Sequence, residues 1–393
     1  MIPKEVLKAL VEIPSYLQKN QEGKVVRAEE EVLAFIENFL KQHNIFSKIQ
    51  KQEVRDGRYN LIACNGNENS ELKLLFCCHV DTVEPKEGQL TSAGRCSVVE
   101  SDGKIFGLGA VDMKGGIAAL LAVLSELGDC SAKDLGVLFY CDEEYDFLGM
   151  KKMAEDGKLK AGLVVFCEPT DLQIINGCRG LIEISGYVRG VTGHPSRPRQ
   201  GLNAISLAKA AFDLLEFRVN RYVHPDMGQS VCNLAAIDGG LEKIREGSRI
   251  VIGREGNNIP NICHVVIEAR TTMEELDAFE LITIYKNLIR EGGGHFKMEK
   301  LRHNFGSFFS KEEDLKLIKK AAREVCGSAF YGDISQAGYY DAQLLLEKQP
   351  MPCAIFGPGP KLAAHQKDEH VSIESLDKTA KTYKRLMELC GVI

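Results

Sequence analysis

Histidine and acidic residues stand at the ends of short, continuous apolar runs in this sequence of 393 residues. The runs LLFCC, GVLFYC, GLVVFC and PCAIF are each followed at once by polar or charged residues or by a GPG turn. Imidazole and carboxylate groups bind zinc and other borderline divalent ions, and a carboxylate can also act as a general base. The side chains with this potential are His79, Asp81, Asp112, Glu143, Glu144, Glu168 and His365.

The number of these groups favours two metal ions. Several carboxylates and two imidazoles close together would repel one another or change protonation unless cations neutralised them. A single tetrahedral zinc needs only three protein ligands plus water, so five plausible ligands suggest two ions about 3.5 to 4 Å apart that share one carboxylate. One of Glu143 and Glu144 is then available as the base that hydrolysis needs. Asp81 could accept a proton from His79 and fix the tautomer of its ring.

The elements that must bring these side chains together can be inferred from the same runs. Continuous apolar runs of this length predict strands that are buried on both faces, as in a parallel sheet flanked by helices. The sequence GGIAALLAVLSELG at 115–128 predicts a helix between the first two strands. Strand, helix, strand is typical of an α/β domain, whose ligand site lies beyond the carboxyl ends of the strands.

The middle of the chain has a different pattern, in the order β-α-β-β-α-β. The expected strands lie at 181–191, 230–238, 262–270 and 295–303, and the expected helices at 201–217 and 272–289. In the second helix, Thr272 and Glu275 have the spacing of a capping box. The order predicts a ferredoxin-like domain inserted into the α/β domain. We expect a catalytic domain of residues 1–177 and 304–393, and an inserted domain of residues 178–303.

The composition argues against several other classes of protein. Lys and Arg number 49 against 55 Asp and Glu, a net charge of −6, so no basic surface for nucleic acid or anionic lipid is expected. No stretch of 18 uncharged apolar residues occurs, and Glu5 and Glu12 interrupt the N-terminal segment, so neither a membrane span nor a signal peptide is expected. Thirteen cysteines without paired spacing predict reduced thiols and a cytoplasmic location.

An ordered set of motifs resembles a known family. The motifs are HVD, GLGAVDMKGG, DEE, EPT, GHPSRPRQGLNAI, NNIP followed by EAR, and FGPG followed by AHQKDEHV. They resemble the co-catalytic zinc family that includes acetylornithine deacetylase, succinyl-diaminopimelate desuccinylase, aminoacylase and carboxypeptidase G. The resemblance covers about residues 60–375. It implies a zinc-peptidase-like catalytic domain that hydrolyses the amide bond of an N-acyl amino acid, and an inserted domain that acts as a lid and forms a homodimer.

The resemblance also implies a role for each site residue. The implied ligands are His79 and Glu168 for one zinc ion, Glu144 and His365 for the other, and Asp112 as the bridge between them. Glu143 would be the general base and acid, and Asp81 would support His79. His194 would stabilise the oxyanion, and in dimeric members this histidine comes from the partner subunit. A cis peptide bond is expected between Asp112 and Met113. Cobalt or manganese could take the place of zinc.

In such a family the inserted domain also binds the carboxylate of the substrate. Here that role falls to Arg270, because a guanidinium suits a bidentate contact with a carboxylate, with Asn257 or Asn258 nearby. One departure affects specificity. Where many members have a small Gly-Thr-Ser-Asp segment, this chain has Tyr339 and Tyr340. The specificity for the acyl group of the substrate therefore cannot be inferred from any one member of the family.

Three alternative readings compete with this one. Gly107 and Gly109 follow part of a nucleotide-binding pattern, but Asp112 stands where a third glycine should be and would repel a pyrophosphate. A metal-binding homologue without catalysis is less favoured, because each catalytic position is filled, Glu143 included. A dipeptidase or carboxypeptidase of the same family would use the same ligands, so the ligand set does not separate it from a deacylase.

Overall fold

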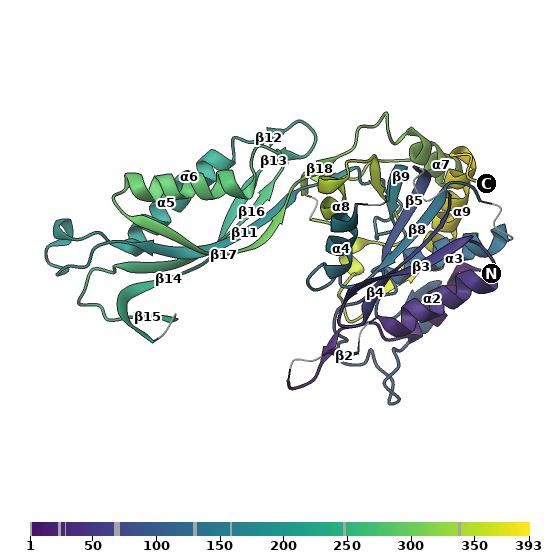
Figure 1. Cartoon of the computed structure of the whole chain (residues 1–393), viewed down its shortest axis with the longest axis horizontal. Coiled ribbons are helices and arrows are strands. Elements are labelled where there is room, and N and C mark those ends of the chain that lie inside the picture. The colour runs from purple at the N-terminus through teal and green to yellow at the C-terminus, as the bar shows by residue number, and fades with distance from the viewer. Residues whose placement is uncertain are drawn as a thin grey trace. The chain divides into compact units, whose positions relative to one another are not determined.

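The structure is a computed structural model that describes residues 2–22, 25–27, 29–66, 71–128, 132–157, 159–246, 249–336 and 339–393. The chain divides into two compact units (Figure 1). The first unit consists of Met1–Gly177, Phe309–Asp333 and Leu344–Ile393. The second unit consists of Cys178–Phe308 and Ile334–Gln343.

A six-stranded sheet forms the centre of the first unit. Its order is β19 (Cys353–Ile355), β9 (Ala161–Phe166), β5 (Leu72–His79), β8 (Leu135–Tyr140), β4 (Arg58–Asn65) and β3 (Lys48–Arg55). The first four of these strands are parallel, and β4 is antiparallel to β8 and β3. Every residue of β8 is buried, as is every residue of β5 except Lys73. The predicted α/β fold with a mainly parallel, buried sheet is confirmed.

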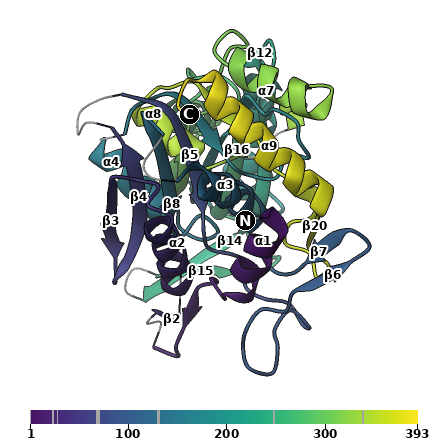
Figure 2. The same ribbon diagram turned by 90° about the vertical axis from the view of Figure 1, so that its right-hand side faces the viewer.

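Helices complete the first unit and its hydrophobic core (Figure 2). They are α1 (Pro3–Glu12), α2 (Glu30–Gln42), α3 (Lys114–Leu127), α4 (Leu148–Asp156), α7 (Lys316–Cys326) and α9 (Ile373–Leu389). The helix α3 packs against α1 and α9, whereas α2 contacts β4 and α4 contacts β3. Since α3 spans nearly the expected 115–128, the helix between the first two parallel strands is also confirmed.

Short elements connect these parts. Two-stranded sheets join β1 (Gln18–Lys19) to β2 (Val25–Arg27) and β10 (Gly177–Cys178) to β18 (Phe308–Phe309). A three-stranded sheet joins β20 (His370–Ser372), β7 (Lys104–Phe106) and β6 (Val99–Ser101). The remaining helices are α8 (Ala342–Lys348) and the 3-10 turns Pro198–Gln200, Ile334–Gln336 and Lys361–Ala363. The chain passes between the two units within β10 and β18, and again between Asp333 and Ile334 and within α8.

The second unit is an antiparallel sheet packed against two helices (Figure 1). The sheet order is β15 (Arg249–Gly253), β14 (Val231–Glu246), β16 (Ile262–Thr271), β11 (Gly180–Arg189) and β17 (His295–Phe305). The helices α5 (Ala204–Val219) and α6 (Ala278–Glu291) follow β11 and β16, and the hairpin β12 (Val223–His224) and β13 (Gly228–Gln229) precedes β14. The strand β15 extends the four-stranded order of a split βαβ motif at one edge.

The second unit differs in two places from the expected residues 178–303. The strand β17 pairs with β11 as far as Phe305, so the unit continues beyond 303. The segment Ile334–Gln343 also belongs to it. Gln343 Nε2 donates to the Arg179 carbonyl oxygen at 2.8 Å, and the ring centre of Tyr339 lies 6.3 Å from that of Phe305. The proposed lid and dimerisation roles of this unit stay predictions.

The predicted start of α6 is wrong. The helix begins at Ala278, and the side chain of Asp277 caps it by accepting the Glu280 N–H at 2.7 Å. Thr272 is buried instead, with its hydroxyl 3.0 Å from the Ser230 hydroxyl. The N-cap of α6 is therefore Asp277, five residues after the predicted Thr272.

Two further sequence-based expectations concern the cell compartment. None of the helices in the described ranges is both long and apolar enough to cross a membrane. Among the same residues, none of the twelve cysteines forms a disulfide. The cytoplasmic location that the cysteine content suggests stays a prediction.

Candidate functional site

The parallel strands of the first unit deliver their polar residues to one edge of the sheet. His79 is the last residue of β5, and Glu168 follows the end of β9. Glu143 and Glu144 follow β8 in the same way. Parallel neighbours end at the same edge, so these residues converge although they are far apart in sequence.

Two further residues reach this edge from segments outside the sheet. Asp112 lies just before α3, and the peptide bond between Asp112 and Met113 is cis, as the resemblance implied. His365 lies between β19 and β20 with a positive φ of 60°, a backbone conformation that is uncommon for residues other than glycine. The backbone carbonyl of His365 accepts a hydrogen bond from the Lys86 ammonium.

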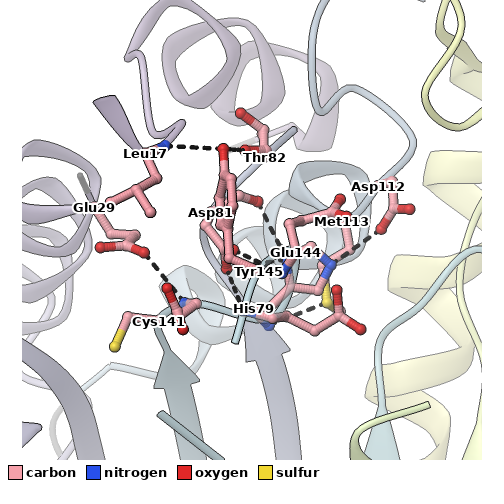
Figure 3. Close-up of polar contacts among 12 residues, drawn as sticks. Leu17, Glu29, His79, Asp81, Thr82, Asp112, Met113, Cys141, Glu144 and Tyr145 are labelled. Carbon is pink, nitrogen blue, oxygen red and sulfur yellow. Dashed lines mark hydrogen bonds and ion pairs between the residues drawn. The ribbon is translucent and has the colours of Figure 1, made fainter. Parts of the chain in front are cut away.

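The carboxylate of Asp112 lies between the two histidines. Figure 3 shows its contact with His79. Its Oδ1 is 3.0 Å from His79 Nε2, and its Oδ2 is 3.5 Å from His365 Nε2. Glu168 Oε1 is 3.5 Å from the same nitrogen of His79, and Glu144 Oε1 is 3.0 Å from the same nitrogen of His365. The five residues therefore form two sets that share Asp112.

Asp81 supports the loop of the two glutamates more directly than it supports the histidine. Its Oδ1 accepts the Glu143 N–H at 3.1 Å, and its Oδ2 accepts the Glu144 N–H at 2.9 Å. His79 Nδ1 lies 3.1 Å from the backbone carbonyl oxygen of Asp81 and 3.6 Å from its carboxylate. The proton on Nδ1 therefore has the carbonyl as its nearer acceptor, which directs Nε2 toward Asp112.

The close charges shift the acidity of the cluster. Hydrogen bonds to Asp112 and Glu144 raise the pKa of His365 to about 10. Burial opposes a charged His79, yet the negative charge of Glu168 and the hydrogen bond to Asp112 raise its pKa well above the usual value. Burial alone would raise the pKa of Asp112, but hydrogen bonds from the two histidines hold it well below its usual value. Burial raises the pKa of Glu144.

The residues expected to contact the substrate all lie in the second unit. His194 is exposed on the loop after β11, and its Nδ1 is 2.7 Å from the Ser196 hydroxyl. Arg270 near the end of β16 donates from Nε to Glu268 at 2.9 Å, and its guanidinium lies 5.5 Å from the ring centre of Tyr339. Asn258 Nδ2 donates to Asn257 Oδ1 at 2.8 Å. Their roles toward the substrate stay predictions.

Glu369 was not identified from the sequence. It is buried, and its Oε1 accepts the N–H groups of Val111 and Asp112, each at 3.1 Å. Burial raises its pKa to about 7. The only local signal for Glu369 in the sequence is its place in the motif AHQKDEHV, four residues after His365.

The donor set fits divalent metal ions. One ligand atom from each of His79, Asp112 and Glu144 lies within 4.8 Å of the others, which is a spacing that a metal ion can bridge. Imidazole nitrogen with carboxylate oxygen is the donor chemistry of zinc and related ions. A parallel sheet with such a cluster beyond its carboxyl ends is the arrangement of an α/β metallohydrolase.

Comparison with known proteins identifies the family. Residues 75–389 match peptidase family M20/M25/M40, and because this span covers most of the sequence, the chain belongs to that family. The acetylornithine deacetylase of Buchnera aphidicola subsp. Acyrthosiphon pisum (strain Tuc7) is 27% identical over 390 residues, which cover 98% of this chain and 96% of the relative. The suspected resemblance is confirmed, and the protein is a metal-dependent hydrolase of amide bonds.

Solved structures show the same fold. Aminopeptidase PepT from Bacillus cereus has a TM-score of 0.74 at 18% identity, with 99% of this chain and 98% of that chain covered. A dinuclear metal-binding peptidase of family M20 from Bacillus subtilis has a TM-score of 0.69 at 15% identity, with 100% and 98% covered. At these identities the likeness supports the architecture alone.

Proposed function

We propose that the protein removes the acyl group from an N-acyl amino acid by means of two divalent metal ions. The observation that carries the proposal is the position of Asp112, whose two carboxylate oxygens face different histidines. Each histidine has its own glutamate, Glu168 or Glu144, at 3.5 or 3.0 Å. A shared carboxylate between two such sets is what a two-metal site requires.

The five residues His79, Glu168, Asp112, Glu144 and His365 would hold the ions, and zinc suits these donors best. When bound, the ions would lower the pKa of a water molecule and polarise the carbonyl oxygen of the substrate. The dinuclear character of the Bacillus subtilis relative agrees with this assignment. Cobalt or manganese would serve the same ligands.

Glu143 would move the proton in the reaction. Asp81 accepts the backbone N–H of Glu143, and Glu143 is half-buried. The negative charge of Glu143 helps to raise the pKa of His79, so its carboxylate lies near the cluster. In this position Glu143 would take the proton of the attacking water and deliver it to the leaving amine.

The second unit would recognise the substrate. Arg270 is held by Glu268 through Nε, and its two terminal nitrogens would bind the substrate carboxylate. Asn257 or Asn258 would assist it, and His194 would donate a hydrogen bond to the developing oxyanion. We further propose a homodimer formed through this unit, and a cytoplasmic location.

Hydrolysis of N-acetyl, N-succinyl and dipeptide substrates by the metal-loaded protein tests this proposal. The acetylornithine deacetylases among the relatives favour N-acetyl amino acids such as N-acetylornithine as the best substrates. A preference for dipeptides would assign the protein to the peptidase alternative, and no hydrolysis of any member of the panel would contradict the proposed function.

A further inference from the structure

Three charged side chains lie buried together beside the loop that carries Glu143 and Glu144. Glu29, Arg58 and Asp142 are 1%, 4% and 0% exposed. Arg58 Nε donates to Glu29 Oε2 at 3.0 Å, and its Nη2 contacts Glu29 Oε1 and lies 2.6 Å from Asp142 Oδ1. The three residues come from the start of α2, the start of β4 and the segment after β8. We call them the buried ion cluster.

Stability alone does not explain this cluster. Removing three charges from water costs several kcal/mol per ion, and well-packed apolar residues are often as stabilising as a buried ion network. Glu29 stands at the N-cap of α2, yet its side chain does not cap that helix. Its carboxylate accepts the Asp142 N–H at 3.1 Å instead. The Glu29 side chain therefore binds the segment after β8 instead of its own helix.

The cluster fixes the backbone that carries Glu143 and Glu144. Asp142 adopts a positive φ of 70°, a conformation that is uncommon for residues other than glycine but that aspartate adopts more often than most. Its Oδ2 accepts the N–H groups of Asp146 and Leu148, at 3.1 and 3.2 Å. The buried carboxylate of Asp142 thus holds the residues after the two glutamates. Asp142 is itself held by Glu29, which accepts its backbone N–H, and by Arg58, which contacts its carboxylate.

Neighbouring contacts complete the support of this loop. Asn60 of β4 accepts the Cys141 N–H at 3.3 Å and donates to the Gly149 carbonyl oxygen at 2.8 Å. A Cβ at Gly149 would lie 2.4 Å from the Cys141 carbonyl oxygen, so only glycine allows the two ends of the loop to meet. Together with Asp81, which binds the two glutamates in the middle, side chains hold the loop at both ends and at its centre.

We propose that Glu29 and Arg58 are positioning residues for catalysis, which hold the loop of the general base Glu143 and the metal ligand Glu144 through Asp142. The inference rests on the proposed function, because it needs a base and a ligand on this loop. A displacement of about 1 Å at a catalytic group can cost on the order of a hundredfold in rate. The cluster would therefore affect turnover more than substrate binding.

Three substitutions in adjacent residues test this role. Glu29→Met keeps the length of the side chain but removes the acceptor of the Asp142 N–H, while Arg58 and Asp142 remain as a balanced pair. Glu29→Gln keeps an acceptor oxygen. Glu30→Met changes the next residue, which is exposed on α2. We expect kcat to fall about tenfold to a hundredfold in Glu29→Met, to stay within about threefold of the parent in Glu29→Gln, and to be unchanged in Glu30→Met.

The expected signature combines several readouts on the metal-loaded protein. For Glu29→Met, KM should stay within about twofold and the bound metal should be the same as in the parent, because the other ligands remain. A lower melting temperature with unchanged kcat would overturn the proposal, since it would mean a purely structural role. If Glu29→Met does not fold, Arg58→Lys, which keeps the positive charge beside Asp142 but loses the bidentate contact with Glu29, is judged by the same criteria. An inactive parent protein would instead refute the proposed function.

Discussion

At the scale of single residues, Glu143 and Glu144 have different environments although they are adjacent. Glu144 lies 3.0 Å from His365, within the cluster of proposed metal ligands. Glu143 is held by Asp81 through its backbone N–H. Two neighbouring carboxylates can therefore divide the work, one binding a metal ion and the other moving a proton.

This division predicts the effect of Glu143→Ala. The variant should lose kcat by about a hundredfold to ten-thousandfold, the usual contribution of a general base, because nothing else takes the proton. Metal content, measured by atomic emission, should remain that of the parent. Glu155→Ala, at an exposed position on α4, is the matched control and should keep full activity. A near-normal rate in Glu143→Ala would show that another group is the base.

The protonation of His365 predicts how metal affinity depends on pH. Because Asp112 and Glu144 raise its pKa to about 10, His365 keeps its proton at neutral pH in the metal-free protein. A metal ion must displace that proton, so the apparent affinity should rise as the pH rises. Calorimetric titration with zinc at pH 7 in two buffers of different ionisation heat should detect at least one released proton. His365→Gln should release about one proton fewer, and equal release in both proteins would contradict this assignment.

At the scale of elements, the loop before α3 depends on Glu369. One oxygen of that buried carboxylate accepts two backbone N–H groups, including that of the shared ligand Asp112. Glu369→Gln retains an acceptor oxygen, whereas Glu369→Ala leaves two buried N–H groups without it, at a cost of about 1 to 3 kcal/mol each.

We therefore expect Glu369→Ala to bind zinc more weakly by about tenfold to a hundredfold, the usual loss when a group that orients a ligand is removed. Glu369→Gln should stay close to the parent. Competition with a fluorescent zinc chelator measures both affinities. Equal affinities in the two variants would show that Glu369 does not hold Asp112.

The strands that lead to the site could be predicted from the sequence because local hydrophobicity decides them. The runs that became β5, β8, β9 and β19 are buried at almost every position. By contrast, β3 was not predicted. Its residues, KIQKQEVR, are partly or fully exposed at the edge of the sheet, so no apolar run marks it.

The supporting residues could not be predicted, because each is a single polar residue whose partner is remote in sequence. Glu369 binds a backbone N–H group 258 residues away, and Glu29 binds one 113 residues away. Charged residues such as Glu29 and Arg58 are usually exposed, and no periodicity distinguishes the buried ones. The proposed ligands His79, Glu144 and Glu168 could be predicted because they follow strands that end at one edge, whereas the supporting residues depend on packing.

At the scale of the whole molecule, the proposed metal ligands and the expected substrate contacts belong to different units. The five proposed ligands and Glu143 lie in the first unit, and His194 and Arg270 lie in the second. The proposed function therefore uses residues of both units, and the resemblance implies that His194 comes from the partner subunit.

This arrangement predicts complementation between two inactive variants. Glu143→Ala and His194→Ala chains, each inactive alone, are mixed after mild dissociation. In a mixed dimer, one site would contain an intact base and an intact histidine, so roughly a quarter of the parent activity should return by random pairing. Activity that does not return, although mixed dimers form, would place His194 in the site of its own chain.

The most direct test of the central claim is the activity of the metal-free protein as zinc is added back. The account predicts that a chelator abolishes amide hydrolysis, and that activity returns in step with zinc binding and reaches its maximum near two ions per chain. Activity that survives complete removal of metal, or a protein that binds no zinc at all, would contradict the two-metal site around Asp112.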